Sequence, residues 1–287
     1  MAFSVTSSNT KIRSIIDSSS NDTLPAPPSI AKAIASLPNS LAVTGLGEEA
    51  TAAHLLSDLT PGFNSPKTSS NYYGFVTGGV LPIAEVADNV VTAFDQNVSV
   101  HLPDQSVSTV VEDTALNMLV ELLKLGDGWE GKTFTTGATA SNILGLACGR
   151  EAVINRRLRR EPELGEVGLL AACMEAGIKQ IQVLTTMGHS SLYKAASVVG
   201  IGRGSVKDIP VSRDEPWRMD LELLEQELEA EEEGVVSIVA VSAGEVNTGK
   251  FAIAGMGEMR KIRNLCDKYR AWLHVDGGKY HAPTCPS

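Results

Sequence analysis

Hydrophobic residues follow one spacing in the first part of the chain and another in the second. In the segments 81–94 and 111–125 they recur at positions i, i+3 and i+4, which predicts two amphipathic helices. Helical patterns also cover 30–37 and 48–59. The first part of the chain is therefore predicted to be mainly helical.

From Lys132 onward, short hydrophobic stretches alternate with longer amphipathic ones. The pattern predicts strands at the start of 132–158 and over 179–186, 205–211, 235–242 and 271–276. Helices are predicted for the rest of 132–158, after a glycine turn, and for 189–200, 220–234 and 257–270. This alternation predicts an α/β fold with a largely parallel sheet covered on both faces. In such sheets, ligands bind at the carboxyl ends of the strands.

Local composition divides the chain further. Residues 7–28 are rich in Ser, Asn, Asp and Pro, so 1–29 is predicted to be a flexible lead. A helical segment, 30–110, follows and includes a long loop at 65–82 that is dense in glycine, aromatic and hydroxyl residues. Loops of this kind are often functional. The α/β domain is expected over 111–278.

The net charge and the cysteine content limit the classes of partner and metal site that the chain could have. The 287 residues include 24 Lys and Arg against 34 Asp and Glu, and the net charge of −10 opposes nucleic acid. The basic cluster at 156–160 ends a predicted helix, where its charges would complement the helix dipole. Four widely spaced cysteines indicate neither a metal site nor disulfides. With no apolar run of about 18 residues and no signal peptide, a soluble cytoplasmic protein is expected.

Three features at predicted strand ends could carry chemistry. In "TTGATASN" a glycine turn opens a helix, so free N–H groups could bind a phosphate, or the turn could be an ordinary helix cap. His189 begins a helix directly after a strand, as a capping residue or a catalyst. Asp276 ends the apolar strand "WLHVD", as a loop or capping residue or as the partner of a cation such as a protonated ring nitrogen.

Six blocks in order carry a resemblance to a known family: "NYYGFVTGG", "FDQNVSVHLPD", "FTTGATASNILGLACGRE", "GHSSLYKAASVVGIG", "VSAGEVNTG" and "WLHVDGG". Over roughly 30–278 the chain resembles the group II pyridoxal-phosphate-dependent amino acid decarboxylases, most closely fungal aromatic or tyrosine decarboxylase-like members. The resemblance implies a homodimeric carboxy-lyase with pyridoxal 5'-phosphate as cofactor. Its substrate would be an amino acid, and the resemblance favours an aromatic one. It also implies a fold type I large domain, partial here over 111–278.

The resemblance also assigns roles to the three features. It implies that Gly137, Ala138 and Thr139 hold the cofactor phosphate. The equivalent of His189 stacks on the pyridine ring and helps to place the substrate carboxylate. The equivalent of Asp276 pairs with the protonated ring nitrogen, which lets the ring accept electrons.

Two further assignments come from the same resemblance. Tyr73 and Thr77 in the "NYYGFVTGG" loop correspond to a substrate-lining segment that acts across a dimer interface. The family's "GTT" threonine is replaced by Val246, so the contact that its hydroxyl would make is either absent or supplied by Asn247 or Thr248.

The resemblance requires a lysine that holds the cofactor as a Schiff base, in an "HKW"-like motif downstream of the aspartate. No "HK" occurs here, and Lys279 lies three residues after Asp276, on the opposite face of a continued strand. We expect a chain truncated before the catalytic lysine and inactive alone, with a non-family tail at 279–287. Codons for 278–280 can contain GTAAGT, the start of a eukaryotic intron, so the tail is interpreted as intron read-through. The alternatives are an aminotransferase or aldolase of the same fold, or a non-catalytic product.

Overall fold

The computed structural model describes residues 3–19, 22–41, 43–65, 69–72, 79–158 and 164–278. The chain divides into two compact units, Met1–Val110 and Val111–Ser287, and each is described by itself. The expected substrate-lining residues Tyr73 and Thr77 lie outside the described residues, and so does Lys279.

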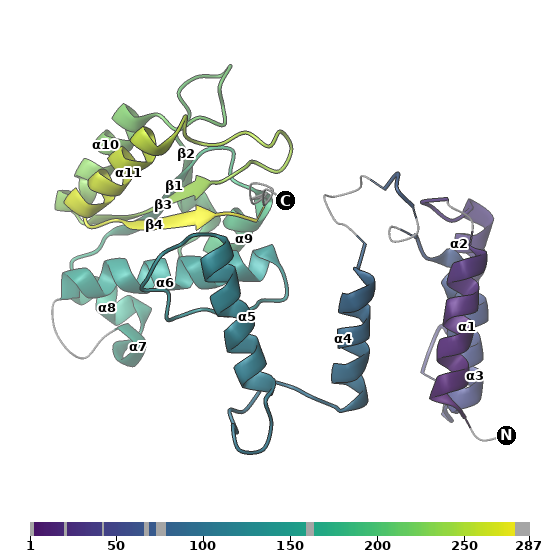
Figure 1. Cartoon of the computed structure of the whole chain (residues 1–287). Helices are drawn as coiled ribbons and strands as arrows, with labels where there is room; N and C mark the ends of the chain where they lie inside the picture. The colour runs from purple at the N-terminus through teal and green to yellow at the C-terminus, as the bar shows by residue number, and fades with distance from the viewer. Residues whose placement is uncertain are drawn as a thin grey trace. The chain divides into compact units, whose positions relative to one another are not determined.

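Short helices make up the described part of the first unit (Figure 1). Gly62 packs so closely on Ala33 that a Cβ at this glycine would lie 2.7 Å from the Ala33 Cβ. The elements are α1 (Val5–Ser18), α2 (Pro27–Ala35), α3 (Glu48–Ala53), the π-helix η1 (His54–Leu59), the 3-10 helix η2 (Thr60–Gly62) and α4 (Pro82–Ala93).

Helix α1 contradicts the prediction that residues 1–29 form a flexible lead. The Ser4 side chain caps it by accepting a hydrogen bond from the Ser7 N–H at 3.3 Å. Ile12, Ile15 and Ile16 recur at helical spacing within the otherwise polar stretch. A cap and an apolar stripe thus favour a helix even though none of its residues is buried.

A four-stranded parallel sheet forms the centre of the second unit (Figure 1). Its strand order is β2-β1-β3-β4, and the register sets Val183 opposite Ile238 and Ile238 opposite Trp272. At the carboxyl edge, Ser242 of β3 lies opposite Asp276 of β4. The strands are β1 (Gln180–Thr185), β2 (Val206–Asp208), β3 (Val235–Ser242) and β4 (Trp272–Asp276). These four predicted strands are confirmed.

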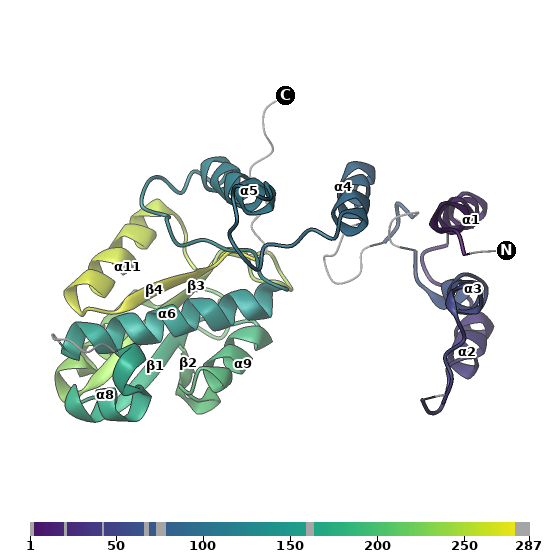
Figure 2. The ribbon, with the colours of Figure 1, turned by 90° about the horizontal axis from the view of Figure 1, so that it is seen from below.

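Helices cover both faces of the sheet, as Figures 1 and 2 show. Side chains of β3 alternate between the two layers: Ile238 packs with α6 and α9, and Val239 packs with α10 and α11. The α/β prediction is therefore confirmed. The helices of this unit are α5 (Ser108–Leu122), α6 (Ala138–Leu158), α7 (Leu164–Val167), α8 (Leu169–Glu175), α9 (Ser190–Val198), α10 (Leu221–Glu229) and α11 (Met256–Lys268), with short 3-10 helices at Arg203–Ser205 and Ala230–Glu233.

The long helix α6 approaches β4 through two glycines one turn apart. A Cβ at Gly145 would lie 2.5 Å from Cε1 of His274, and a Cβ at Gly149 would lie 2.7 Å from Cδ1 of Trp272. Real Cβ atoms do not come that close to other atoms, so only glycine allows this separation of helix and strand. The close approach brings the first turns of α6 to the end of β4.

The strand predicted at the start of 132–158 is wrong. The described chain has no strand over 132–137, although α6 follows where a helix was predicted. An extended segment becomes a strand only by pairing with a neighbour, and this one pairs with no strand of the sheet.

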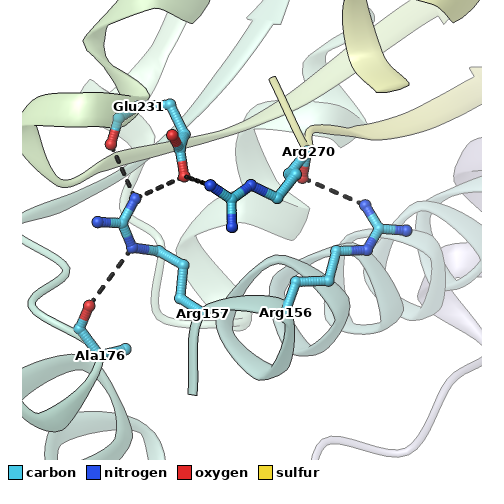
Figure 3. Close-up of polar contacts among 5 residues, drawn as sticks. All are labelled: Arg156, Arg157, Ala176, Glu231 and Arg270. Carbon is cyan, nitrogen blue, oxygen red and sulfur yellow. Dashed lines mark hydrogen bonds and ion pairs between the residues drawn. The ribbon is translucent and has the colours of Figure 1, made fainter. Parts of the chain in front are cut away.

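The basic cluster at the end of α6 does more than complement a helix dipole (Figure 3). Arg157 donates to the Glu231 carboxylate at 2.7 Å, to the Glu231 carbonyl at 2.8 Å and to the Ala176 carbonyl at 3.4 Å. Arg156 donates to the Arg270 carbonyl at 3.2 Å. These acceptors precede β1, β3 and β4, so the two arginines tie together the chain entering three strands.

Two general properties complete the description. In the described ranges, no helix combines the length and the apolar character needed to cross a bilayer. Cys148, Cys173 and Cys266 are free thiols.

Candidate functional site

Asp276 ends β4 at the carboxyl edge of the sheet. Its Oδ2 accepts from the Asn142 side-chain amide at 3.0 Å, and its Oδ1 accepts from the Gly278 N–H at 3.2 Å. No described Lys, Arg or His forms an ion pair with it. The carboxylate is thus held by neutral donors and keeps its negative charge available.

The turn before α6 forms the second part of the site. Gly137 has a φ of +153°, where L side chains are rarely found, and an added Cβ would meet nothing within 4 Å. Ala138 and Thr139 then open a helix of 21 residues, whose first N–H groups have no partner within the helix. This open, electropositive helix start suits an anion.

The helix start and Asp276 lie beside each other. A Cβ built on Gly278 would lie 3.4 Å from Oδ1 of Asp276 and 3.7 Å from the Cβ of Ala138. Two features separated by more than a hundred residues in the sequence therefore border one glycine.

His189 is the N-cap of α9, as one of the two interpretations predicted, and it caps the helix through one of its two ring nitrogens. Its Nδ1 accepts from the Ser191 N–H at 3.3 Å and lies 2.7 Å from Ser191 Oγ. Within the described chain, no residue is hydrogen-bonded to its Nε2, and the side chain is exposed. Capping leaves the outer edge of this imidazole free to meet a ligand.

Asn142 connects these parts, although the sequence did not indicate it. Its side chain is buried, with 2% exposed, and its Nδ2 donates to Ser191 Oγ and to Asp276 Oδ2, each at 3.0 Å. Its Oδ1 lies 2.8 Å from Nε2 of His274. One amide from α6 thus joins α9 and β4.

His274 was also missed. Burial lowers the pKa of this imidazole, although the nearby Asp276 carboxylate acts in the opposite direction. The signal was present in the strand itself, because His274 and Asp276 are two residues apart and therefore share a face of β4. A four-residue spacing of glycines, Gly145 to Gly149, marks the helix face that meets His274 and Trp272 of the same strand.

Asn247, expected as a cofactor contact, donates its side-chain amide to Oε1 of Glu245 at 2.6 Å. The Thr248 hydroxyl donates to Oε2 of the same carboxylate at 3.0 Å. Burial alone would raise the pKa of Glu245, but hydrogen bonds from these two residues hold it below its ordinary value. Both candidate replacements for the missing threonine are thus engaged by a buried glutamate.

A parallel sheet with an open helix start and a carboxylate at its carboxyl edge defines an α/β protein of the class in which ligands bind at the strand ends. The chain belongs to the pyridoxal-dependent decarboxylase family, whose conserved-domain model matches residues 71–281. The match extends three residues beyond 278, where family-like sequence was expected to end. The cofactor of this family is pyridoxal phosphate.

Individual relatives agree with the family. The chain is similar to L-2,4-diaminobutyrate decarboxylase of Acinetobacter baumannii, with 28% identity over 68% of this chain and 37% of the relative. The fold resembles the glutamate decarboxylase domain of a Vibrio parahaemolyticus diaminobutyrate-pyruvate transaminase and L-2,4-diaminobutyrate decarboxylase, with a TM-score of 0.73 and 20% identity over 95% of this chain and 56% of that one. It also resembles Oryza sativa TDC, solved with PLP and tryptamine, with a TM-score of 0.68 and 20% identity over 94% of this chain and 56% of that one.

The chain spans between about a third and just over half of the length of these proteins. Within that span, its residues fit the family's cofactor. The helix start can accept a phosphate, and the carboxylate of Asp276 has no competing cation in the described chain.

Proposed function

We propose that this chain supplies the pyridoxal phosphate site of an amino acid decarboxylase. One observation carries the proposal: the Asp276 carboxylate and Ala138, the first residue of α6, border the same glycine, Gly278. A carboxylate suits a protonated ring nitrogen, and a helix N-terminus suits a phosphate. Pyridoxal phosphate carries both groups.

Each part of the site has a distinct task in this proposal. When bound, pyridoxal phosphate supplies a ring that accepts the electron pair left on Cα as carbon dioxide departs. Asp276 holds the proton on the ring nitrogen through its uncompensated charge. Gly137, Ala138 and Thr139 bind the phosphate through the N–H groups of the helix start.

His189 would orient the substrate. Its Nδ1 is the acceptor for the Ser191 N–H, so the neutral ring carries its proton on Nε2. That N–H points away from the cap and can donate to a substrate carboxylate, while the exposed face of the imidazole can stack on the cofactor ring.

Binding of pyridoxal phosphate to the 287-residue chain, measured by equilibrium dialysis, tests the proposal. Asp276→Asn should weaken binding at least about tenfold, since an ionic partner of the ring nitrogen becomes a neutral one. Asp220→Asn is the control, because Asp220 caps α10 by accepting from Glu222 and Leu223. Equal affinities for wild type and Asp276→Asn would contradict the role given to this carboxylate.

The phosphate half of the site has its own comparison. Pyridoxal without the phosphate should bind more weakly than pyridoxal phosphate to wild type and to Asp276→Asn by a similar factor. A wild-type chain that does not distinguish the two molecules would exclude the helix start as a phosphate site.

We further propose that the chain alone binds the cofactor without releasing carbon dioxide. The resemblance places the cofactor-bound lysine in a histidine–lysine motif, and that dipeptide does not occur in this sequence. Borohydride reduction followed by mass spectrometry is the measurement. A pyridoxyl-lysine adduct at one site, together with carbon dioxide release, would show that the chain is active alone.

The finer features of the enzyme are also proposals: an aromatic amino acid as substrate, a cytoplasmic homodimer, and Tyr73 and Thr77 lining the substrate across its interface. Sequencing transcripts past the codon for Gly277 would find any form with a downstream histidine–lysine motif. Carbon dioxide release by that form from tyrosine and tryptophan should exceed release from glutamate, aspartate and 2,4-diaminobutyrate. Sedimentation would give its oligomeric state.

A further inference from the structure

The side chain of Asn142 has a partner for each N–H and for its oxygen in the interior of the second unit. Its two N–H groups match two acceptors, Ser191 Oγ and Asp276 Oδ2, and its oxygen faces Nε2 of His274. Only 2% of the residue is exposed. A buried amide with every group satisfied fixes its neighbours in one arrangement.

The amide also fixes where protons lie. Because Asn142 Oδ1 can only accept, the proton of His274 must be on Nε2. Because Asn142 Nδ2 can only donate, Ser191 Oγ accepts from it. His189 Nδ1 already accepts from the Ser191 N–H, so the Ser191 hydroxyl donates to Nδ1 at 2.7 Å. The amide thus sets the proton position of His274 directly and reaches His189 through the Ser191 hydroxyl.

We propose that Asn142 is a positioning residue that orients the Asp276 carboxylate and the His189 imidazole together for the cofactor. The role rests on the proposed function, in which these two side chains meet pyridoxal phosphate. A neutral amide suits the task because it orients the carboxylate without cancelling its charge. A lysine or arginine in its place would compete with the protonated ring nitrogen for Asp276.

The first test needs no cofactor. The sequence contains five histidines, few enough to resolve and assign in long-range proton–nitrogen spectra of the imidazoles. In the wild type, His189 and His274 should both carry their proton on Nε2. Asn142→Asp keeps the acceptor oxygen but removes both N–H donors. At neutral pH, His274 should then become doubly protonated. The proton of His189 should be shared between its two ring nitrogens.

Two more variants separate this role from a general loss of structure. Asn155→Asp is the matched control in the same helix. Asn155 Oδ1 accepts a hydrogen bond from the Leu164 N–H, and a carboxylate oxygen can accept the same bond. It should leave both histidine signals unchanged. Ser191→Ala removes the hydroxyl that links Asn142 to His189 but keeps the contacts of Asn142 with Asp276 and His274. It should alter the His189 signal and leave the His274 signal as in wild type, and it is the substitute test if Asn142→Asp does not fold.

The second test measures binding of pyridoxal phosphate. Asn142→Asp should weaken it at least about tenfold, because Asp276 loses one of its two donors and gains a neighbouring carboxylate. Altered histidine signals with unchanged affinity would overturn the positioning role. His274 protonated on Nδ1 in the wild type would overturn the hydrogen-bond assignment itself.

The two tests also separate this inference from the proposed function. A wild-type chain with the expected histidine signals but no binding of pyridoxal phosphate would refute the proposed function, and the positioning role with it. A wild-type chain that binds the cofactor, with Asn142→Asp binding equally well, would refute only the role of Asn142.

Discussion

The two ends of α6 carry polar clusters of opposite character. At the amino edge of the sheet, Arg156 and Arg157 donate to carbonyls and to Glu231, pairing charge with charge where the chain enters the strands. At the carboxyl edge, Asn142 donates to Asp276 and leaves its charge unpaired in the described chain. The charges at the arginine end of α6 are thus paired within the protein, whereas the Asp276 charge at the other end is available to a ligand. Substitutions at the two ends should therefore affect different measurements.

The largest expected effect on stability comes from Arg157→Ala. It leaves the Glu231 side chain, which is 13% exposed, without its shortest ion pair, and it removes the Arg157 hydrogen bonds to the carbonyls of Glu231 and Ala176. The free energy of unfolding should fall by about 3 kcal/mol in urea titrations, near the lower end for breaking a buried pair. Affinity of the folded fraction for pyridoxal phosphate should not change.

Arg213→Ala is the control for that experiment, because Arg213 is exposed and should alter stability by no more than about 0.5 kcal/mol. A clear loss of cofactor affinity in Arg157→Ala would mean that the two ends of α6 are not independent.

A smaller loss is expected from Gly149→Ala, midway along α6. The new Cβ would lie 2.7 Å from Trp272 Cδ1 and 3.1 Å from Ile238 Cδ1, so the helix must move away from β4. Overpacking of this kind should cost about 2 kcal/mol. Gly257→Ala in α11 meets nothing within 4 Å and should be neutral or slightly stabilising in the same urea titration. If both variants lose stability equally, helix–strand contact is not what requires glycine at 149.

The smallest effect concerns pH at the carboxyl end. His274 has its pKa lowered from 6.5 mainly by burial, so below pH 6.5 the unfolded chain binds a proton that the folded chain does not. The contribution of this group to stability is therefore complete above pH 6.5 and is lost as pH falls through the folded pKa. His274→Gln keeps an N–H near the Nε2 position but cannot titrate, so acidification from pH 7.5 to 5 should destabilise it less than wild type. Equal losses in urea titrations of the two proteins would contradict this.

Sequence periodicity predicted the strands that carry the site, because alternating burial on β3 and the apolar run of β4 are local properties. It placed Asp276 and His189 at strand ends for the same reason. It did not indicate Asn142, whose partners Ser191 and Asp276 lie 49 and 134 residues away. A buried amide in a helix has no periodic signature of its own.

Two errors have local physical causes. The segment before Gly137 has the composition of a strand, but no strand of the sheet pairs with it. The N-terminal stretch has the composition of a flexible lead, yet a serine cap and spaced isoleucines form α1. Composition indicates which secondary structures a segment can adopt, whereas pairing partners and helix caps determine which of them forms.

The hydrogen bond between Asn142 and Asp276 closes a loop of 134 residues, and β4 is the last strand of the described sheet in chain order. Contacts of such long separation form slowly, because the entropy of closing the loop precedes any gain from the contact. The site therefore comes into existence only when β4 docks. A ligand that needs Asp276 binds only the docked state and stabilises it in proportion to its concentration. Binding of such a ligand is thus a reporter of completed folding.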